Sequence, residues 1–231
     1  MSDWLQFVDR KIGTALMLDE GQCNGSYSDA CVLLSALLSG IAAELWPGSD
    51  RIDGRRFAEL WFRFCPKELQ PIQISVPLLR RSFLRSGQQQ EAKLLEERRP
   101  DMFNLGHRSL VLRGEEVDLP EAEVLKLPLT ITQKDLRRYS YPAVFYKHVR
   151  SSLVHEFKLS DDAASRRATR MQANVSYVNR GDADAHELRR RLIHFHIEWL
   201  EKLTRAIAAN VAELFDNYER LPRPTSWWLD G

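Results

Sequence analysis

The strongest constraint on the fold is a long series of apolar residues near the C-terminus that repeats every three or four positions. This spacing places apolar side chains along one face of an α-helix. The segment Asp184–Glu187 resembles a capping box, and Pro222 and Pro224 stop a helix. We therefore predict a long amphipathic helix from about Asp184 to Arg220. Its apolar series is Leu188, Leu192, Phe195, Trp199, Leu203, Ile207, Val211, Leu214 and Tyr218.

Shorter apolar patterns predict further helices in the rest of the chain, so the expected fold is one mainly α domain over residues 1–231. Residues that favour β-structure cluster between about 103 and 132, which predicts a small hairpin or extended insert. Asn174–Val178 is also expected to be extended. The other predicted helices are Asp3–Met17, a helix from a cap at Ser28 or Asp29 to Trp46, Asp53–Phe64, Leu78–Ser86, Gln89–Arg99 and Pro142–Phe157.

Composition excludes several classes of site. The formal net charge is +1, so no global field attracts nucleic acid and any site for a polyanion must be a local patch. The three cysteines, Cys23, Cys31 and Cys65, include no CxxC pair, which argues against a disulfide framework and a cysteine zinc site. No glycine-rich phosphate loop or metalloprotease motif occurs. We expect neither a cofactor nor a metal.

The N-terminus is acidic and aromatic and lacks the basic and apolar regions of a signal peptide. The longest apolar run, Ala30–Leu45, is interrupted by polar residues, and we interpret it as too short and too polar to span a bilayer. A cytoplasmic protein without a membrane partner is therefore expected.

The residue types that suit chemistry gather on the predicted helix Pro142–Phe157. Phe145, Val149, Leu153 and Phe157 are four apart and form one apolar face, while His148, Ser151, Ser152 and His155 form another. His148 and His155 are seven apart and should project in nearly the same direction, whereas Arg150 lies roughly 140° from His155 on an ideal helix. Histidine can transfer a proton near neutral pH, and arginine matches phosphate geometry with paired donors.

Arg150-Ser-Ser-Leu-Val-His155 resembles the signature of the HEPN superfamily, an arginine followed after four to six residues by a histidine on a late helix of a helical domain. The order of segments from about Tyr139 to Arg220 is also similar. The resemblance implies an up-and-down helical bundle with a long C-terminal helix, in which the chain pairs as a homodimer across a composite cleft. Many members are endoribonucleases that leave a 2′,3′-cyclic phosphate, and several are toxins or defence proteins, so an antitoxin protein is among the implied partners. Family members often carry Asn, Asp or His where this chain has Ser151.

Five other arginine–histidine pairs between Arg180 and His196 have the same spacing and compete with this one. The serines and the apolar run around His155 favour the first pair. Of the basic runs, Arg166, Arg167 and Arg170 are the best candidates for contacts with an RNA backbone, since they follow the signature helix directly. His194 and His196 would point apart on a helix, which favours a structural role over a metal site. Trp227 and Trp228 are expected to dock on the body of the protein.

The leading hypothesis is a metal-independent endoribonuclease that cleaves RNA through attack of the 2′-OH. His155 would be its general base or acid and Arg150 its phosphate-stabilising cation, supported by Ser151 and with His148 as an assistant. The alternative is a catalytically silent dimer that binds RNA, a nucleotide or a protein partner. A helical scaffold without such a site is the third hypothesis.

Overall fold

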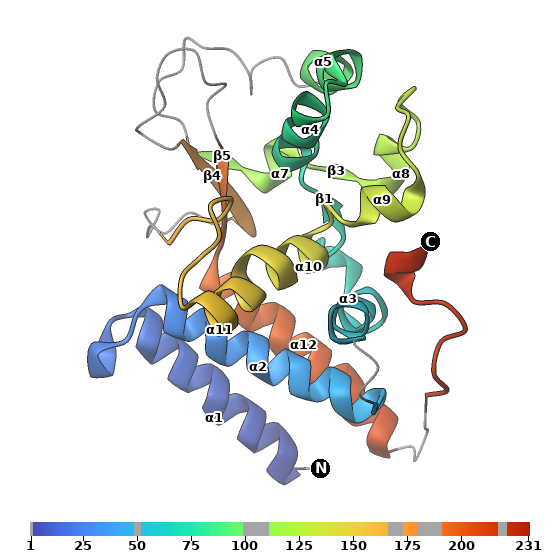
Figure 1. The fold of residues 1–231 in the computed structure, drawn as a ribbon. Helices are drawn as coiled ribbons and strands as arrows, with labels where there is room; N and C mark the ends of the chain where they lie inside the picture. Colours follow the sequence, from blue (N-terminus) through green and yellow to red (C-terminus); the bar gives the residue numbers. More distant parts are fainter. Residues whose placement is uncertain (1, 49–51, 99–110, 166–172, 180–190, 217–220) are drawn as a thin grey trace.

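A computed structural model describes residues 2–48, 52–98, 111–165, 173–179, 191–216 and 221–231. The described part of the chain is mainly helical, as predicted. In Figure 1, the helices α1, α2 and α12 lie side by side in the lower part of the molecule, and the segment from α10 (Tyr141–Val144) to α11 (Ser152–Glu156) crosses above α2. The small sheets and the shorter helices α4, α5 and α7 to α9 occupy the upper part.

The first two long helices form an antiparallel pair. α1 spans Ser2–Asp19 and α2 spans Tyr27–Leu45, and both contact α12 (Ile197–Asp216). The N-cap of α2 is Ser26, whose side chain accepts a hydrogen bond from the backbone N–H of Asp29. The Asp29 carboxylate accepts in return from the Ser26 N–H, which makes a capping box. The helix thus starts before the predicted caps at Ser28 or Asp29.

α2 also corrects the expectation about a membrane span. Because the helix begins at Tyr27, it has 19 residues, and among the described helices it alone is long and apolar enough to cross a bilayer by length and composition. In this fold, however, α2 contacts α1, α3 (Asp53–Phe64) and α12, and one of its faces is buried in the core. A core helix can have the same composition as a membrane helix, and burial of one face in the core accounts for part of the apolar character of α2.

The middle helices agree closely with the predictions. α3 has the predicted bounds, α4 spans Val76–Arg85 and α5 spans Gln89–Arg98. Phe57, Leu60 and Trp61 of α3 are fully buried. α3 contacts the lower helices α2 and α12 and also the α10–α11 segment.

The C-terminal helix is shorter than predicted. Arg191–Phe195 is the strand β5, and α12 begins only at Ile197. β5 pairs antiparallel with β4 (Val175–Asn179), with Val175 opposite Phe195. The spacing of Leu192, Phe195 and Trp199 suits a helix, but pairing with a partner strand overrides such a local pattern. The predicted capping box at Asp184–Glu187 lies outside the described residues. The extended prediction for Asn174–Val178 is confirmed by β4.

The predicted hairpin between 103 and 132 is wrong for the part that the structure describes, residues 111–132. β2 (Leu112–Arg113) adds to β4, whereas β3 (Leu119–Pro120) pairs with β1 (Gln73–Ile74). The short helices α7 (Gly114–Val117) and α8 (Glu121–Val124) interrupt the segment, and α9 (Gln133–Arg137) follows it. β2 and β3 have two residues each, and each pairs with a strand from a distant segment instead of with the other across a local turn.

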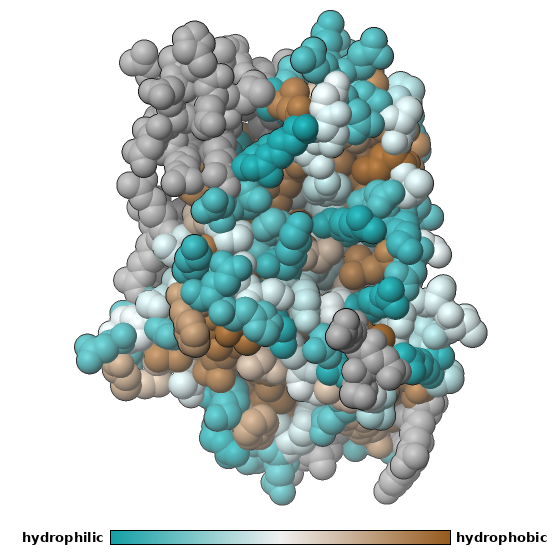
Figure 2. All heavy atoms as spheres, viewed as in Figure 1, coloured by the Kyte–Doolittle hydropathy of each residue, from teal (hydrophilic) through white to brown (hydrophobic). Residues whose placement is uncertain are grey.

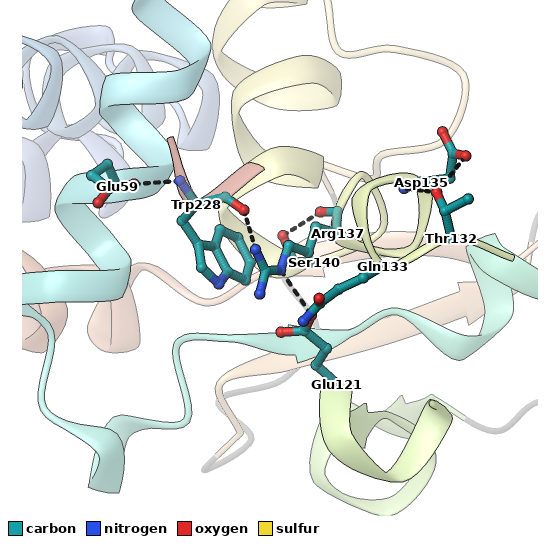
Figure 3. A network of polar contacts seen from close by, with 8 residues as sticks. All are labelled: Glu59, Glu121, Thr132, Gln133, Asp135, Arg137, Ser140 and Trp228. Atoms are coloured by element: carbon teal, nitrogen blue, oxygen red, sulfur yellow. Dashed lines mark hydrogen bonds and ion pairs between the residues drawn. The ribbon is translucent and has the colours of Figure 1, made fainter. Parts of the chain in front are cut away.

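The C-terminal tryptophans dock on the body, as predicted. Trp227 and Trp228 are buried, and the Trp228 N–H donates to Oε2 of Glu59 at 2.6 Å. Figure 3 shows Arg137 beside Trp228, where its guanidinium donates to the Trp228 carbonyl and pairs with Glu121. The guanidinium carbon also lies 4.8 Å from the centre of the Trp228 ring. These contacts fasten the C-terminal segment to α3 and α9.

Candidate functional site

The predicted signature helix is present, but its middle is a π-helix. α10 spans Tyr141–Val144, the π-helical segment spans Phe145–Ser151, and α11 spans Ser152–Glu156. A π-helix has more residues per turn than an α-helix and occurs frequently at functional sites. The extra residue changes the direction in which the following side chains project. The predicted polar face therefore does not survive, since Ser152 is buried while His155 is exposed, although the predicted apolar face persists as far as Leu153.

Arg150 is held on the side of the segment that faces α3. Its guanidinium carbon lies 4.9 Å from the centre of the Tyr146 ring, and its Nη1 donates to the Tyr146 hydroxyl at 3.2 Å. The Tyr146 ring packs in turn on Phe57 and on Gly54, where an added Cβ would lie 3.1 Å from the ring. Partial burial raises the pKa of Tyr146, and the positive charge of Arg150 opposes this shift. Arg150 is thus a positioned cation that is still partly exposed.

His148 lies in a different cluster. Its Nδ1 is 2.9 Å from Oγ of Ser160 and 3.8 Å from Oδ2 of Asp162, which also pairs with Arg81 of α4. Burial, together with the charge of Lys147, lowers the pKa of His148 to about 4, although Asp162 opposes the shift. At 3.8 Å the attraction of Asp162 is weaker than the cost of burying a charge, so His148 is neutral at neutral pH. It holds the chain after α11 against the π-helical segment, while the ion pair of Asp162 with Arg81 joins that chain to α4.

His155 is exposed near the end of α11. The seven-residue spacing predicted that the two histidines would project together, but His148 lies inside the π-helical segment, where α-helical spacing does not apply, and it contacts Ser160 and Asp162. Ser152 is buried and Ser151 is half-buried. Figure 2 shows hydrophilic and hydrophobic residues next to one another over α10 and α11, so this surface is open and mixed.

Phe157 corrects the predicted apolar face. Phe145, Val149 and Leu153 are buried as expected, but Phe157 is 90% exposed. It is the C-cap of α11 and has left-handed backbone angles, φ 55° and ψ 22°. The helix ends one residue before the spacing required, so the side chain leaves the apolar face. The proposed RNA contacts Arg166, Arg167 and Arg170 lie outside the described residues.

Sequence reasoning missed a buried polar cluster around Asp118. Its Oδ2 accepts hydrogen bonds from the hydroxyls of Tyr141 and Tyr177, each at 2.7 Å, and its Oδ1 accepts from the N–H of Val76 at 3.0 Å. The Tyr177 oxygen also lies 2.7 Å from Oγ of Ser75, so this serine can donate to it. Burial raises the pKa of Asp118 to about 7, although the two tyrosine hydroxyls oppose the shift.

This cluster joins segments that are distant in the sequence and is closed to solvent. Asp118 is only 5% exposed, and a Cβ at Gly114 would collide with the Tyr141 hydroxyl at 2.4 Å. A carboxyl with a raised pKa suits acid–base chemistry only where a substrate can reach it. The enclosure therefore favours a structural role. Asp118 is one of several acidic residues between Glu115 and Glu123 and has no distinctive spacing, which explains why the sequence did not point to it.

His194 and His196 also form a buried pair. Because they follow strand geometry, their rings lie on the same side with centres 4.9 Å apart, contrary to the prediction from a helix. Nδ1 of His194 is 3.0 Å from the Ala164 carbonyl oxygen, and Nε2 of His196 is 3.0 Å from Oγ of Ser176. Burial lowers the pKa of both, to about 4 for His196. Their burial fits the structural role predicted for them.

No group of three or more His, Cys, Asp or Glu side chains that could hold a metal ion occurs in the described parts of the chain. Cys31 and Cys65 are buried, and burial raises the pKa of each thiol to about 12, whereas Cys23 is exposed. Both buried thiols are therefore protonated and unreactive at neutral pH.

Comparison with known proteins assigns the chain to no family. No family model matches the chain, and neither a curated protein nor a solved structure shows significant similarity to it. The resemblance to the HEPN superfamily consequently depends on the sequence motif alone, and the functional argument depends on the geometry around Arg150 and His155.

Proposed function

We propose that the protein is a metal-independent endoribonuclease of the HEPN type that acts as a homodimer. The observation that carries the proposal is the fixed position of Arg150. Tyr146 orients its guanidinium through a ring contact and one hydrogen bond, and the residue remains partly exposed. Arginine has five N–H donors. The remaining donors can pair with the oxygens of a phosphate, where a positioned cation stabilises the charge that develops in the transition state.

The proton transfers are assigned to His155, because it is exposed and follows Arg150 on the same segment. Cleavage begins when a base removes the proton of the 2′-OH and the 2′-oxygen attacks phosphorus. It ends when an acid protonates the departing 5′-oxygen, which leaves a 2′,3′-cyclic phosphate. Two histidines suit these two steps. A two-fold dimer supplies both, one His155 from each copy, and can also bring Arg150 of one copy close to His155 of the other.

Cleavage of a labelled RNA in EDTA tests the proposal. Arg150→Ala and His155→Ala should each lower the rate by about 100-fold or more, the range of general acid–base and charge-stabilising residues. Arg138→Ala is the matched control, since Arg138 is exposed at 66% of its side chain and pairs only locally with Asp135. Equal rates for wild type and both variants would remove these residues from the mechanism.

The dimer is tested by mixing. Wild-type and His155→Ala chains are co-expressed in increasing ratios and purified together. If one site uses His155 from both copies, mixed dimers are inactive and the rate falls faster than the wild-type fraction. A rate that follows the wild-type fraction in proportion would show that each chain carries a complete site.

The second candidate is a catalytically silent dimer that binds RNA, a nucleotide or a protein partner. The observation that favours it is that the described contacts of Arg150 are with Tyr146, whereas those of His148 are with Ser160 and Asp162. RNA binding that depends on Arg150, without cleavage and without dependence on His155, would select this candidate. A toxin or defence role, with an antitoxin protein as partner, belongs to the endoribonuclease candidate. It is therefore supported only if RNA cleavage is observed.

A further inference from the structure

Phe157 is the most exposed large hydrophobic residue in the part of the chain that the structure describes. Its exposed fraction is 90%, whereas the others lie between 39% and 50%. It also has a positive φ of 55°, a conformation that is unfavourable for a residue with a bulky side chain. The residue therefore costs folding free energy through its backbone and gains almost none through packing.

The turn at Phe157 needs the backbone conformation but not the phenyl ring. After the turn, Leu159 packs against the core, and the Ser160 N–H donates to the His148 carbonyl oxygen at 3.1 Å. A left-handed residue after the last helical turn allows this reversal, and glycine provides it at the least cost. The fold alone would thus favour glycine at position 157. The presence of phenylalanine points to something outside the chain that the ring contacts.

The surroundings indicate the chemistry of that contact. His155, Glu156 and Lys158 are exposed beside Phe157 in the sequence, so a titratable imidazole and an ammonium group flank the ring together with one carboxylate. An exposed aromatic ring beside cationic or titratable side chains is the arrangement by which proteins hold single-stranded RNA, because the ring stacks on a base while the charged groups contact phosphate. A base in a duplex has its faces covered by its neighbours, so the ring requires an unpaired nucleotide.

We propose that Phe157 is a stacking platform for one unpaired nucleobase of the RNA that binds at the end of α11. This inference rests on the proposed function, since it names the residue that holds a base next to His155. Phe157 takes no part in proton transfer. It selects single-stranded RNA and places the backbone of the stacked nucleotide beside the site.

The test separates binding from folding with Phe157→Gly. The variant should raise the urea midpoint of unfolding, because glycine relieves the left-handed backbone, and weaken the binding of a labelled single-stranded RNA by about 10-fold or more. Phe157→Trp should keep the affinity within about threefold. Gln70→Gly is the matched control, since Gln70 is exposed and also has a positive φ, of 49°. It should raise the midpoint in the same way and leave RNA binding unchanged.

A second comparison uses RNA in which single bases are removed one at a time. For wild type, one abasic position should weaken binding, and for Phe157→Gly the same position should have no further effect. If Phe157→Gly binds the intact RNA as tightly as wild type, the stacking inference is wrong while the proposed function stands. If Phe157→Gly instead converts a wild-type dimer to a monomer without changing RNA affinity, the ring contacts a second copy and the inference is again wrong. A wild-type protein that binds no RNA would overturn both.

Discussion

Two polar regions of this protein differ in what they contribute. Around Asp118, each hydrogen bond connects segments that are distant in the sequence, and almost no surface is left for solvent. At the end of α11, His155 and Phe157 are exposed, and Phe157 adds an unfavourable backbone conformation. The first region raises the free energy of unfolding, whereas the backbone conformation in the second region lowers it. An unfavourable local conformation that no packing contact offsets is expected at a functional surface.

The largest effect on stability is expected from Asp118→Asn, through its dependence on pH. Burial raises the folded-state pKa of Asp118 to about 7, above the unfolded value of about 3.9. The folded protein thus binds the extra proton, and the stability that this proton provides is lost as the pH rises from about 4 through 7. Relative to the variant, wild type should lose about 4 kcal/mol over this range.

Urea unfolding of both proteins between pH 4 and 8 measures this difference. The other titrating groups are the same in both chains, so they cancel in the comparison. Parallel curves for wild type and Asp118→Asn would mean that Asp118 is ionised throughout. The cluster would then depend on a charged carboxylate instead of a neutral one.

A smaller effect of opposite sign is expected from His148→Gln. Burial lowers the folded-state pKa of His148 to about 4, below the unfolded value of about 6.5. Stability is therefore present above pH 6.5 and is lost as the pH falls towards 4. Over this pH range, His148→Gln should therefore lose up to about 3 kcal/mol less stability than wild type. His196 has a similarly lowered pKa and keeps part of the acid dependence in both proteins. Thermal unfolding at pH 4.5 and 7 would reveal the change, and an unaltered acid dependence would contradict it.

The smallest effect on stability should come from His155→Ala, although this variant is expected to lose RNA cleavage. An exposed side chain without structural contacts contributes within about 0.5 kcal/mol. The comparison of the two regions would fail if His155→Ala destabilised the protein as strongly as His148→Gln. The free energy of unfolding at pH 7, measured beside the cleavage rate of the same preparation, decides between these outcomes.

Much of the helical content was predictable because local signals agree with tertiary packing. α3 has its predicted bounds, and α1, α4 and α5 begin and end within two residues of theirs. The apolar periodicity of these helices records which face meets the core. At β5 the same periodicity misled, because Arg191–Phe195 finds a partner in β4 that no local pattern reveals. The burial of Trp227 and Trp228 was predictable, since exposed tryptophans are costly, but their partners Glu59 and Arg137 were not.

At the candidate site too, some features follow from the local sequence and others only from tertiary contacts. The sequence by itself determined that Arg150, His148 and His155 share one helical segment and that Phe145, Val149 and Leu153 bury its other face. Only the tertiary structure decided that His148 lies in a π-helical segment, that Tyr146 holds Arg150, and that Ser160 and Asp162 contact His148. The physical reason is that helical periodicity fixes direction only while the hydrogen-bond pattern is constant. Packing against distant segments, here α3, α4 and the chain after α11, sets that pattern and the final surroundings of each side chain.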